Sequence, residues 1–97
     1  MSYAFHPDAE AELSEAIKWY ESRDSGLGLD FATEVYAAIQ RALAFPHAGQ
    51  EMDGDIRRAL LHRFPYGVLY APERDRLLII AVMHLHREPG YWQNRHV

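Results

Sequence analysis

The stretch Leu77-Leu78-Ile79-Ile80-Ala81-Val82-Met83, which runs on into His84-Leu85-His86, decides the fold of this chain. A run of this length is far too short to span a bilayer, which takes about 20 apolar residues. Apolar side chains at consecutive positions, with no polar alternation, are typical of a strand that is covered on both faces. Residues 77–86 are therefore predicted to form the central strand of a sheet.

Shorter strand patterns precede this central strand. Residues 56–63 and 68–71 predict two strands, joined by a turn at 64–67 that contains Pro and Gly. The charged segment 72–76 then forms the hairpin loop to the central strand, and the polar residues 48–55 form a loop ahead of all three. The second half of the chain is thus predicted to be an antiparallel sheet.

The first half of the chain begins with a short strand and a helix. Residues 3–6 predict the strand, and Pro7 suits the first helical position because its missing N–H would be unpaired there anyway. The helix ends near Arg23, since residues 24–28 have the composition of a turn. Its apolar face consists of Ala9, Leu13, Ala16, Ile17 and Tyr20, at helical spacing.

A second helix is predicted to begin near Leu29 or Asp30 and to stop before Pro46. Its main apolar stripe consists of Phe31, Val35, Ala38, Ile39 and Ala42. A further stripe, to one side, consists of Leu29, Tyr36 and Leu43. One stripe is enough to cover a core, so the further stripe is either a wider core contact or a docking surface for a partner.

Together these elements predict an α+β fold in a single domain of residues 1–97, in the order strand, helix, helix, strand, strand, strand. The helical hairpin packs on one face of a mainly antiparallel sheet. The other face is expected to be partly open, with Arg and His side chains of the last three strands on its floor. Residues 89–95 are expected to form a short helix or an ordered C-terminal arm.

Composition favours a cytoplasmic protein with no membrane partner. The chain has no Cys, and residues 1–7 have neither the basic region nor the apolar run of a signal peptide. The net charge of −4 divides unevenly, because residues 1–55 hold 11 acids and 3 bases and residues 56–97 hold 3 acids and 7 bases, all Arg. The basic half is either an uneven solvated surface or a face for an acidic partner.

Four residues have the chemistry for RNA cleavage. His84 and His86 are two apart and point to the same face of a strand, and Arg58 and His62 share a face of the neighbouring strand. Such a set contains a base, an acid and a cation. The alternative is that a His at the end of a central strand is only a polar residue leaving the core. A metal site from His62, His84 and His86 would rest on strand spacing alone, so neither a metal nor a cofactor is expected.

The order of elements and several local strings resemble the RelE/ParE superfamily, the toxins of type II toxin–antitoxin systems. The strings are residues 13–21, 28–31, 56–58, 63–70 and 84–92, and the resemblance spans residues 5–95. It implies a toxin that a protein antitoxin holds inactive. Within the superfamily, RelE-like members cleave mRNA in the ribosomal A site, whereas ParE-like members poison DNA gyrase.

Two features make the ParE-like branch the closer resemblance. The ribonuclease branch usually places an Arg just before the core of its third strand, where this chain has Gly67. Lys18 is the only Lys, and the pI near 5.8 argues against a broad basic surface for ribosomal RNA. A gyrase poison that is not itself an enzyme is therefore expected. The alternatives are a ribosome-dependent mRNA endonuclease and a non-toxic family member that only binds its antitoxin.

The resemblance also suggests contact surfaces. The expected target-binding residues are Arg87, Tyr91, Trp92 and Arg95, since Arg and aromatic residues are enriched at interface hot spots. Folding of the two aromatics back on the sheet is the alternative. An amphipathic antitoxin helix is expected beside Leu29, Tyr36 and Leu43, with acidic antitoxin residues on Arg57, Arg58 and Arg63. Sequence-specific DNA binding by this chain alone is not expected, because its helices hold only three bases, Lys18, Arg23 and Arg41.

Overall fold

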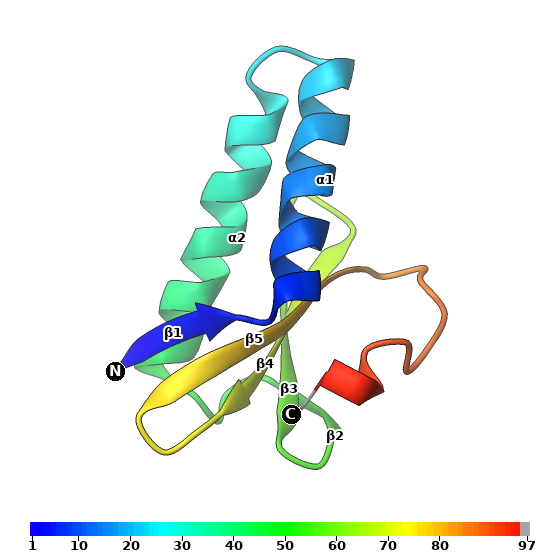
Figure 1. The fold of residues 1–97 in the computed structure, drawn as a ribbon. Helices are drawn as coiled ribbons and strands as arrows, with labels where there is room; N and C mark the ends of the chain where they lie inside the picture. Colours follow the sequence, from blue (N-terminus) through cyan, green and yellow to red (C-terminus); the bar gives the residue numbers. More distant parts are fainter. Residues whose placement is uncertain (96–97) are drawn as a thin grey trace.

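A computed structural model describes residues 1–95 and shows a helical hairpin standing on one face of a five-stranded sheet (Figure 1). The elements are β1 (Ser2–Phe5), α1 (Pro7–Arg23), α2 (Leu27–Ala44), β2 (Gln50–Asp53), β3 (Ile56–Leu60), β4 (Tyr66–Pro72), β5 (Arg76–His84) and the 3-10 turn η1 (Gln93–Arg95). The sheet order is β1-β5-β4-β3-β2. Only the β1–β5 pair is parallel, so the predicted α+β architecture and its element order are confirmed.

The central strand is β5, as its apolar run predicted. It pairs with β4 on one side and β1 on the other, and its residues 77–83 are all buried. The strand ends at His84 instead of His86, because the backbone N–H of Leu85 donates to the carbonyl of Pro65 and the chain turns away. Beyond Ile79 the outer side of β5 has no strand partner, since β1 pairs only with residues 76–79.

The helical hairpin is held by specific polar contacts at its ends. His6 caps α1, its Nδ1 accepting from the backbone N–H of Asp8 at 3.0 Å. The second helix starts at Leu27, two residues earlier than predicted, because the Glu21 carboxylate accepts from the N–H groups of Gly26 and Gly28. Gly28 also lets the helices approach, since a Cβ there would lie 2.7 Å from the carbonyl oxygen of Ile17. No helix in residues 1–95 is long and apolar enough to cross a membrane.

Both faces of the sheet carry an apolar cluster. Under the helices the fully buried residues include Phe31, Val35, Ile39, Val68, Leu77 and Ile79. On the opposite face a second cluster contains Ile56, Leu69, Leu78, Ile80, Met83 and Trp92. The expectation of a partly open face is correct only in part. The C-terminal arm folds over this face and buries Trp92, but Arg58 lies on it as expected and lines a cavity of about 400 Å³ there.

Two further boundaries differ from the sequence-based ones. The predicted polar loop 48–55 contains β2, an edge strand that forms a hairpin with β3 around Gly54 at φ 56°. The predicted strand 56–63 stops at Leu60. After it the side chains of Leu61 and Phe64 turn into the core, while the N–H groups of His62 and Arg63 donate to the Glu34 carboxylate on α2.

A candidate binding cavity between the first helix and the sheet

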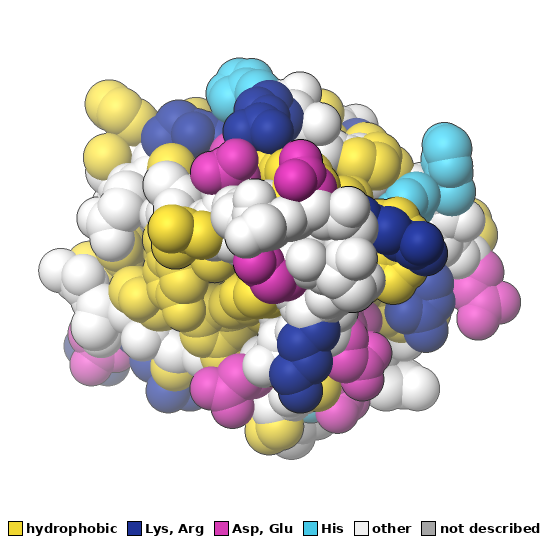
Figure 2. All heavy atoms as spheres, turned by 90° about the horizontal axis from the view of Figure 1, so that it is seen from above, with side chains coloured by type: hydrophobic (Ala, Val, Ile, Leu, Met, Phe, Trp, Pro, Cys, Tyr) yellow, Lys and Arg dark blue, Asp and Glu magenta, His cyan; other side chains and the backbone are white. Residues whose placement is uncertain are grey.

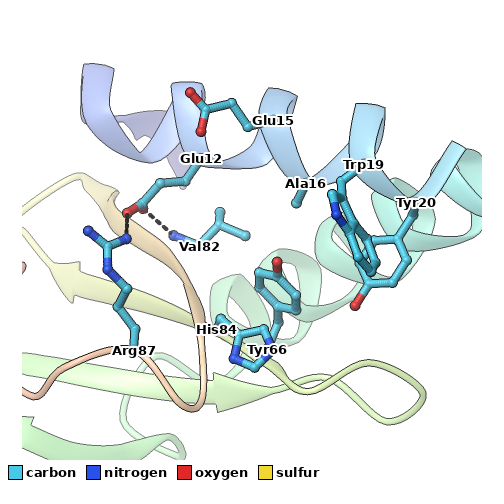
Figure 3. A pocket seen from close by; sticks show the side chains of 9 residues that line it. All are labelled: Glu12, Glu15, Ala16, Trp19, Tyr20, Tyr66, Val82, His84 and Arg87. Carbon is cyan, nitrogen blue, oxygen red and sulfur yellow. Dashed lines mark hydrogen bonds and ion pairs between the residues drawn. The ribbon is translucent and has the colours of Figure 1, made fainter. Parts of the chain in front are cut away.

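A cavity of about 350 Å³ lies between α1 and the ends of β4 and β5 (Figure 3). From α1 it is lined by Glu12, Glu15, Ala16, Trp19 and Tyr20, which share one helical face at positions i, i+3, i+4, i+7 and i+8. From the sheet and the loop after it, the lining is Tyr66, Val82, His84 and Arg87. One end of the cavity is ionic and the other is aromatic.

The ionic end is organised around the Glu12 carboxylate. It accepts from the N–H of Val82 at 3.0 Å, from the Tyr91 hydroxyl at 2.7 Å and from both terminal nitrogens of Arg95 at 2.9 and 3.1 Å. A guanidinium nitrogen of Arg87 lies 3.9 Å away. Arg95 also donates to the carbonyl of Ile80 at 3.2 Å, so the pair satisfies backbone groups of β5 beyond the end of β1.

These contacts shift the ionisation of the arm residues. Burial raises the pKa of the Tyr91 hydroxyl, and its hydrogen bond to the Glu12 carboxylate raises the pKa further. For Arg95, burial lowers the pKa, but the hydrogen bond and charge of Glu12 outweigh burial and leave the pKa raised. Tyr91 therefore stays a neutral donor and Arg95 a cation, and both hold the C-terminal arm to α1.

The aromatic end is a corner of steeply inclined rings. The rings of Trp19 and Tyr20 are 5.0 Å apart at 89°, and those of Tyr20 and Tyr66 are 6.1 Å apart at 65°. The ring of His84 continues the wall, 5.1 Å from Tyr66 at 73°. Burial raises the pKa of both tyrosines, so their hydroxyls remain neutral hydrogen-bonding groups at physiological pH.

The tautomer of His84 follows from its neighbour. The backbone N–H of His86 donates to Nδ1 of His84 at 3.0 Å, so a neutral His84 carries its proton on Nε2. The two imidazole rings are 5.3 Å apart, but His86 lies beyond the strand and is exposed. The two histidines therefore do not form the same-face strand pair that the sequence suggested.

The four candidate catalytic residues fall into two groups. His84 lies directly opposite Tyr66 in the neighbouring strand, and directly opposed residues share a face of the sheet. Because Tyr66 packs against the core under the helices, His84 lies on the helix side of the sheet. Arg58 is paired with Leu69 of the cluster on the opposite face, where its stem lies against Gly67 and it donates to Gln50 at 2.6 Å. The remaining candidate, His62, is in the loop after β3. The structure therefore separates His84, which lines the cavity beneath α1, from Arg58 and His62, which both line another cavity of about 440 Å³ beside the end of α2.

The four expected target-binding residues cluster along the arm, but they differ in exposure. The side chain of Arg87 is 51% exposed, and its guanidinium lies 4.0 Å above the ring of Tyr91. Trp92 is only 3% exposed and belongs to the second core cluster, and Arg95 is mostly buried against Glu12. Among these four residues, the largest charged surface open to solvent is that of Arg87.

The apolar residues expected to bind an antitoxin lie on the outer side of α2. Leu29 is 70% exposed and Tyr36 41% exposed, whereas Leu43 packs partly against the core. The ring of Tyr36 also contacts Tyr3 and Phe5, with centroids 6.5 and 6.4 Å away. Seen from above the hairpin, Figure 2 shows a broad area of exposed apolar side chains with acidic and basic groups around it.

The two remaining arginines of that set have partners within the chain. Arg57 donates to the backbone carbonyls of His47 and Gly49, which fixes the segment before β2. The exposed Arg63 pairs with Asp30 of α2 at 3.2 Å. Arg63 is thus free to exchange its partner, whereas Arg57 holds part of the fold.

Sequence reasoning missed the cavity itself. Glu12 and Glu15 carried a usable signal, because together with Trp19 and Tyr20 they form a polar and aromatic stripe beside the core stripe of α1. The contribution of Tyr66 could not be anticipated, since it depends on how β4 lies under the helix. Among residues 1–95 no group of three or more His, Asp or Glu side chains is placed to hold a metal ion.

The fold is that of a small α+β domain whose C-terminal arm closes over one face of the sheet. A solved structure described as "Chromosomal ParDE TA system from P. aeruginosa" is similar, with a TM-score of 0.72 at 18% identity over 87% of this chain and 95% of that chain. The family model "ParE toxin of type II toxin-antitoxin system, parDE" matches residues 3–89. The chain therefore belongs to the ParE toxin family, which confirms the resemblance to the ParE-like branch. No curated protein matches it significantly.

Proposed function

We propose that this ParE family member is the toxin of a type II toxin–antitoxin pair, that it acts in the cytoplasm by inhibiting DNA gyrase, and that a cognate antitoxin neutralises it. Family membership over residues 3–89 supports the toxin role. The observation that favours binding over RNA cleavage is the separation of His84, which lines the cavity beneath α1, from Arg58 and His62, which line a different cavity. An acid, a base and a cation must lie within reach of one phosphate to cleave RNA.

The proposed gyrase contact is the C-terminal arm. Arg87 supplies the exposed cation, while Tyr91, Trp92 and Arg95 hold the segment around it against Glu12 and the second core cluster. Arginine stacked on an aromatic ring is pre-organised, so little side-chain entropy remains to be lost when it binds.

The test is a pair of assays on one preparation, gyrase supercoiling and mRNA cleavage on programmed ribosomes. The expected result is loss of supercoiling with intact mRNA. Arg87→Gln should weaken the inhibition at least tenfold, and the matched variant Arg74→Gln, at an exposed loop position, should leave it unchanged. Cleaved mRNA with normal supercoiling would replace the proposal with the endonuclease alternative. If the protein neither inhibits supercoiling nor cleaves mRNA, the alternative that remains is a non-toxic family member that only binds its antitoxin.

For the antitoxin we propose an amphipathic helix on the outer side of α2, over Leu29, Tyr36 and Leu43. Two large apolar side chains exposed on one helix support this, because a helix presenting apolar residues at matching spacing would cover them. Acidic antitoxin residues would pair with the proposed contacts Arg57, Arg58 and Arg63. Of these, Arg63 is the most exposed, and its guanidinium is held by an exposed ion pair with Asp30 and by a contact with the ring of Phe64.

The antitoxin surface can be tested with the toxin and the antitoxin purified from co-expression of the neighbouring gene. Leu29→Asp should raise the dissociation rate of the complex at least tenfold, whereas Ala37→Asp, exposed on the same helix but turned by about 100° from Tyr36, serves as control. Arg63→Glu should mainly slow association, as expected of a charge at an interface rim. Unchanged rates in Leu29→Asp would exclude this side of α2 as the interface.

A further inference from the structure

The cavity beneath α1 has features that neither the gyrase nor the antitoxin proposal uses. Three aromatic rings, those of Trp19, Tyr20 and Tyr66, meet at steep angles at one end. Their hydroxyls and the indole N–H have no hydrogen-bond partner among the bonds found in residues 1–95. Figure 3 shows open space between these rings, with Glu15 above them and His84 below. Aromatic rings carry negative charge density on their faces, and one face of Tyr20 is already stacked on Phe31, 5.1 Å away at 26°.

The charged residue that lines this end of the cavity is Glu15, whereas Arg23 lies against the Trp19 ring without lining the cavity. Glu15 is exposed on α1, four residues before Trp19, and forms no ion pair among residues 1–95. Residues at i and i+4 of a helix are neighbours, so a change of the Glu15 rotamer, which points away from the rings in Figure 3, would bring its carboxylate to the aromatic corner. The other carboxylate, Glu12, is already neutralised by Arg95 and Arg87 at the far end. Figure 3 shows Arg87 beside Glu12, on the opposite side of the cavity from Trp19 and Tyr20.

The indole of Trp19 already accepts a cation on one side. The guanidinium carbon of Arg23 lies 4.4 Å from the centroid of the Trp19 ring. A guanidinium within about 6 Å of an indole centroid is attracted by the ring quadrupole. An arginine also offers five donors for the Glu15 carboxylate and the two phenol oxygens, more than the three of a lysine.

We propose that this cavity binds an arginine side chain from a protein partner, held between the rings of Trp19, Tyr20 and Tyr66 and paired with Glu15. Such a site would give a partner a specific anchor on the α1 side of the molecule, away from the outer surface of α2. The proposal depends on neither gyrase inhibition nor antitoxin binding, because it rests on the cavity, its rings and its unpaired carboxylate alone. Its recognition chemistry is that of a planar organic cation in an aromatic corner.

The test uses the full-length chain labelled with ¹⁵N and three short probes at millimolar concentration. The probes are acetyl-Gly-Arg-Gly-amide, the same peptide with neutral citrulline in place of arginine, and the same peptide with glutamate. The arginine peptide should shift the indole signal of Trp19 and the amide signals of Tyr66 and His84. The citrulline and glutamate peptides should shift them at least fivefold less at equal concentration, because they lack the positive charge. Equal shifts with citrulline would overturn the proposal.

Variants distinguish binding that depends on the positive charge from nonspecific binding. Glu15→Gln should weaken binding of the arginine peptide at least threefold, and Glu10→Gln, an exposed position on α1 that does not line the cavity, should leave it unchanged. Trp19→Ala should abolish the shifts at Tyr66 and His84. Spermidine is included because a free polyamine offers positive charge without a peptide. Tighter binding of spermidine than of the arginine peptide would overturn the assignment to a protein partner, as would equal affinities in Glu15→Gln and the wild type.

Discussion

Replacing Glu12 with Gln is expected to lower the free energy of unfolding by about 3 kcal/mol, the low end of what breaking a buried ion pair costs. The carboxylate is mostly buried and accepts four hydrogen bonds, two of them from Arg95, whose side chain is 12% exposed. A Gln at this position keeps one acceptor for the backbone N–H of Val82 but loses the charge. The mostly buried guanidinium of Arg95 would then keep only the exposed Asp8, whose carboxylate lies 3.7 Å from its Nε, as a counter-ion, and the loss of Glu12 dominates the estimate.

The assay is urea and thermal unfolding followed by circular dichroism, and in a Trp19→Phe background the fluorescence of the buried Trp92 reports locally on the arm. For a chain of this size about 3 kcal/mol corresponds to a fall in Tm of roughly 15 °C. Glu10→Gln, the same change at an exposed position of α1, should stay within about 0.5 kcal/mol of the wild type. A double-mutant cycle with Arg95→Met isolates the pair, and its coupling energy should exceed about 1.5 kcal/mol. A loss below about 1 kcal/mol in Glu12→Gln would refute the conclusion that this carboxylate fastens the arm.

Three further changes test the packing and ionisation of the fold. Trp92→Ala should cost about 3–5 kcal/mol by urea unfolding, because the side chain is 3% exposed, whereas Trp19→Ala, at a 52% exposed position, should cost less than about 1 kcal/mol. Gly28→Ala should lower the free energy of unfolding by about 2 kcal/mol, because its Cβ would lie 2.7 Å from the carbonyl oxygen of Ile17. This is opposite to the usual preference of helices for Ala, so a gain in stability would disprove the close approach. The pKa of Tyr91 is raised from 10.0 in the folded state, so above pH 10 the unfolded chain loses its proton first and stability falls as the pH rises. Tyr91→Phe should reduce that fall between pH 10 and 11 by up to about 1.4 kcal/mol in urea titrations.

The elements that sequence predicted well are those whose signals are local. The seven-residue apolar run located β5, and Pro7 and Pro46 marked helix limits because proline acts on its own backbone and its nearest neighbours. The early start of α2 was missed because it depends on Glu21, a residue of α1. Its carboxylate reaches across the turn and accepts hydrogen bonds from the N–H groups at the start of α2. The edge strand β2 was missed because its residues are polar and gain strand structure only by pairing with β3.

The candidate site was less predictable than the fold because its residues come together across the chain. Glu12 meets the arm 79 to 83 positions later, at Tyr91 and Arg95, and nothing in the spacing of those residues signals the contact. The arm was recognised as a segment rich in Arg and aromatic residues, which is the composition of an interface. The same composition also suits a segment that covers the second face of its own sheet. Trp92 does this, because its side chain is buried in the cluster on that face.

The placement of His84 depends on one irregularity that no sequence pattern reveals. Unbroken alternation along the central strand would put His84 on the same face as Leu78 and Ile80, which is the face of Arg58. The register between β4 and β5 shifts, however, because Leu69 pairs with Ala81 and the next residue, Tyr70, pairs with Ile79. Ile80 is thus an extra residue, and both it and Ala81 belong to the cluster opposite the helices. The bulge turns Val82 and His84 to the helix side, where they line the cavity. A single added residue in β5 therefore separates the imidazole from the guanidinium that a ribonuclease would need beside it.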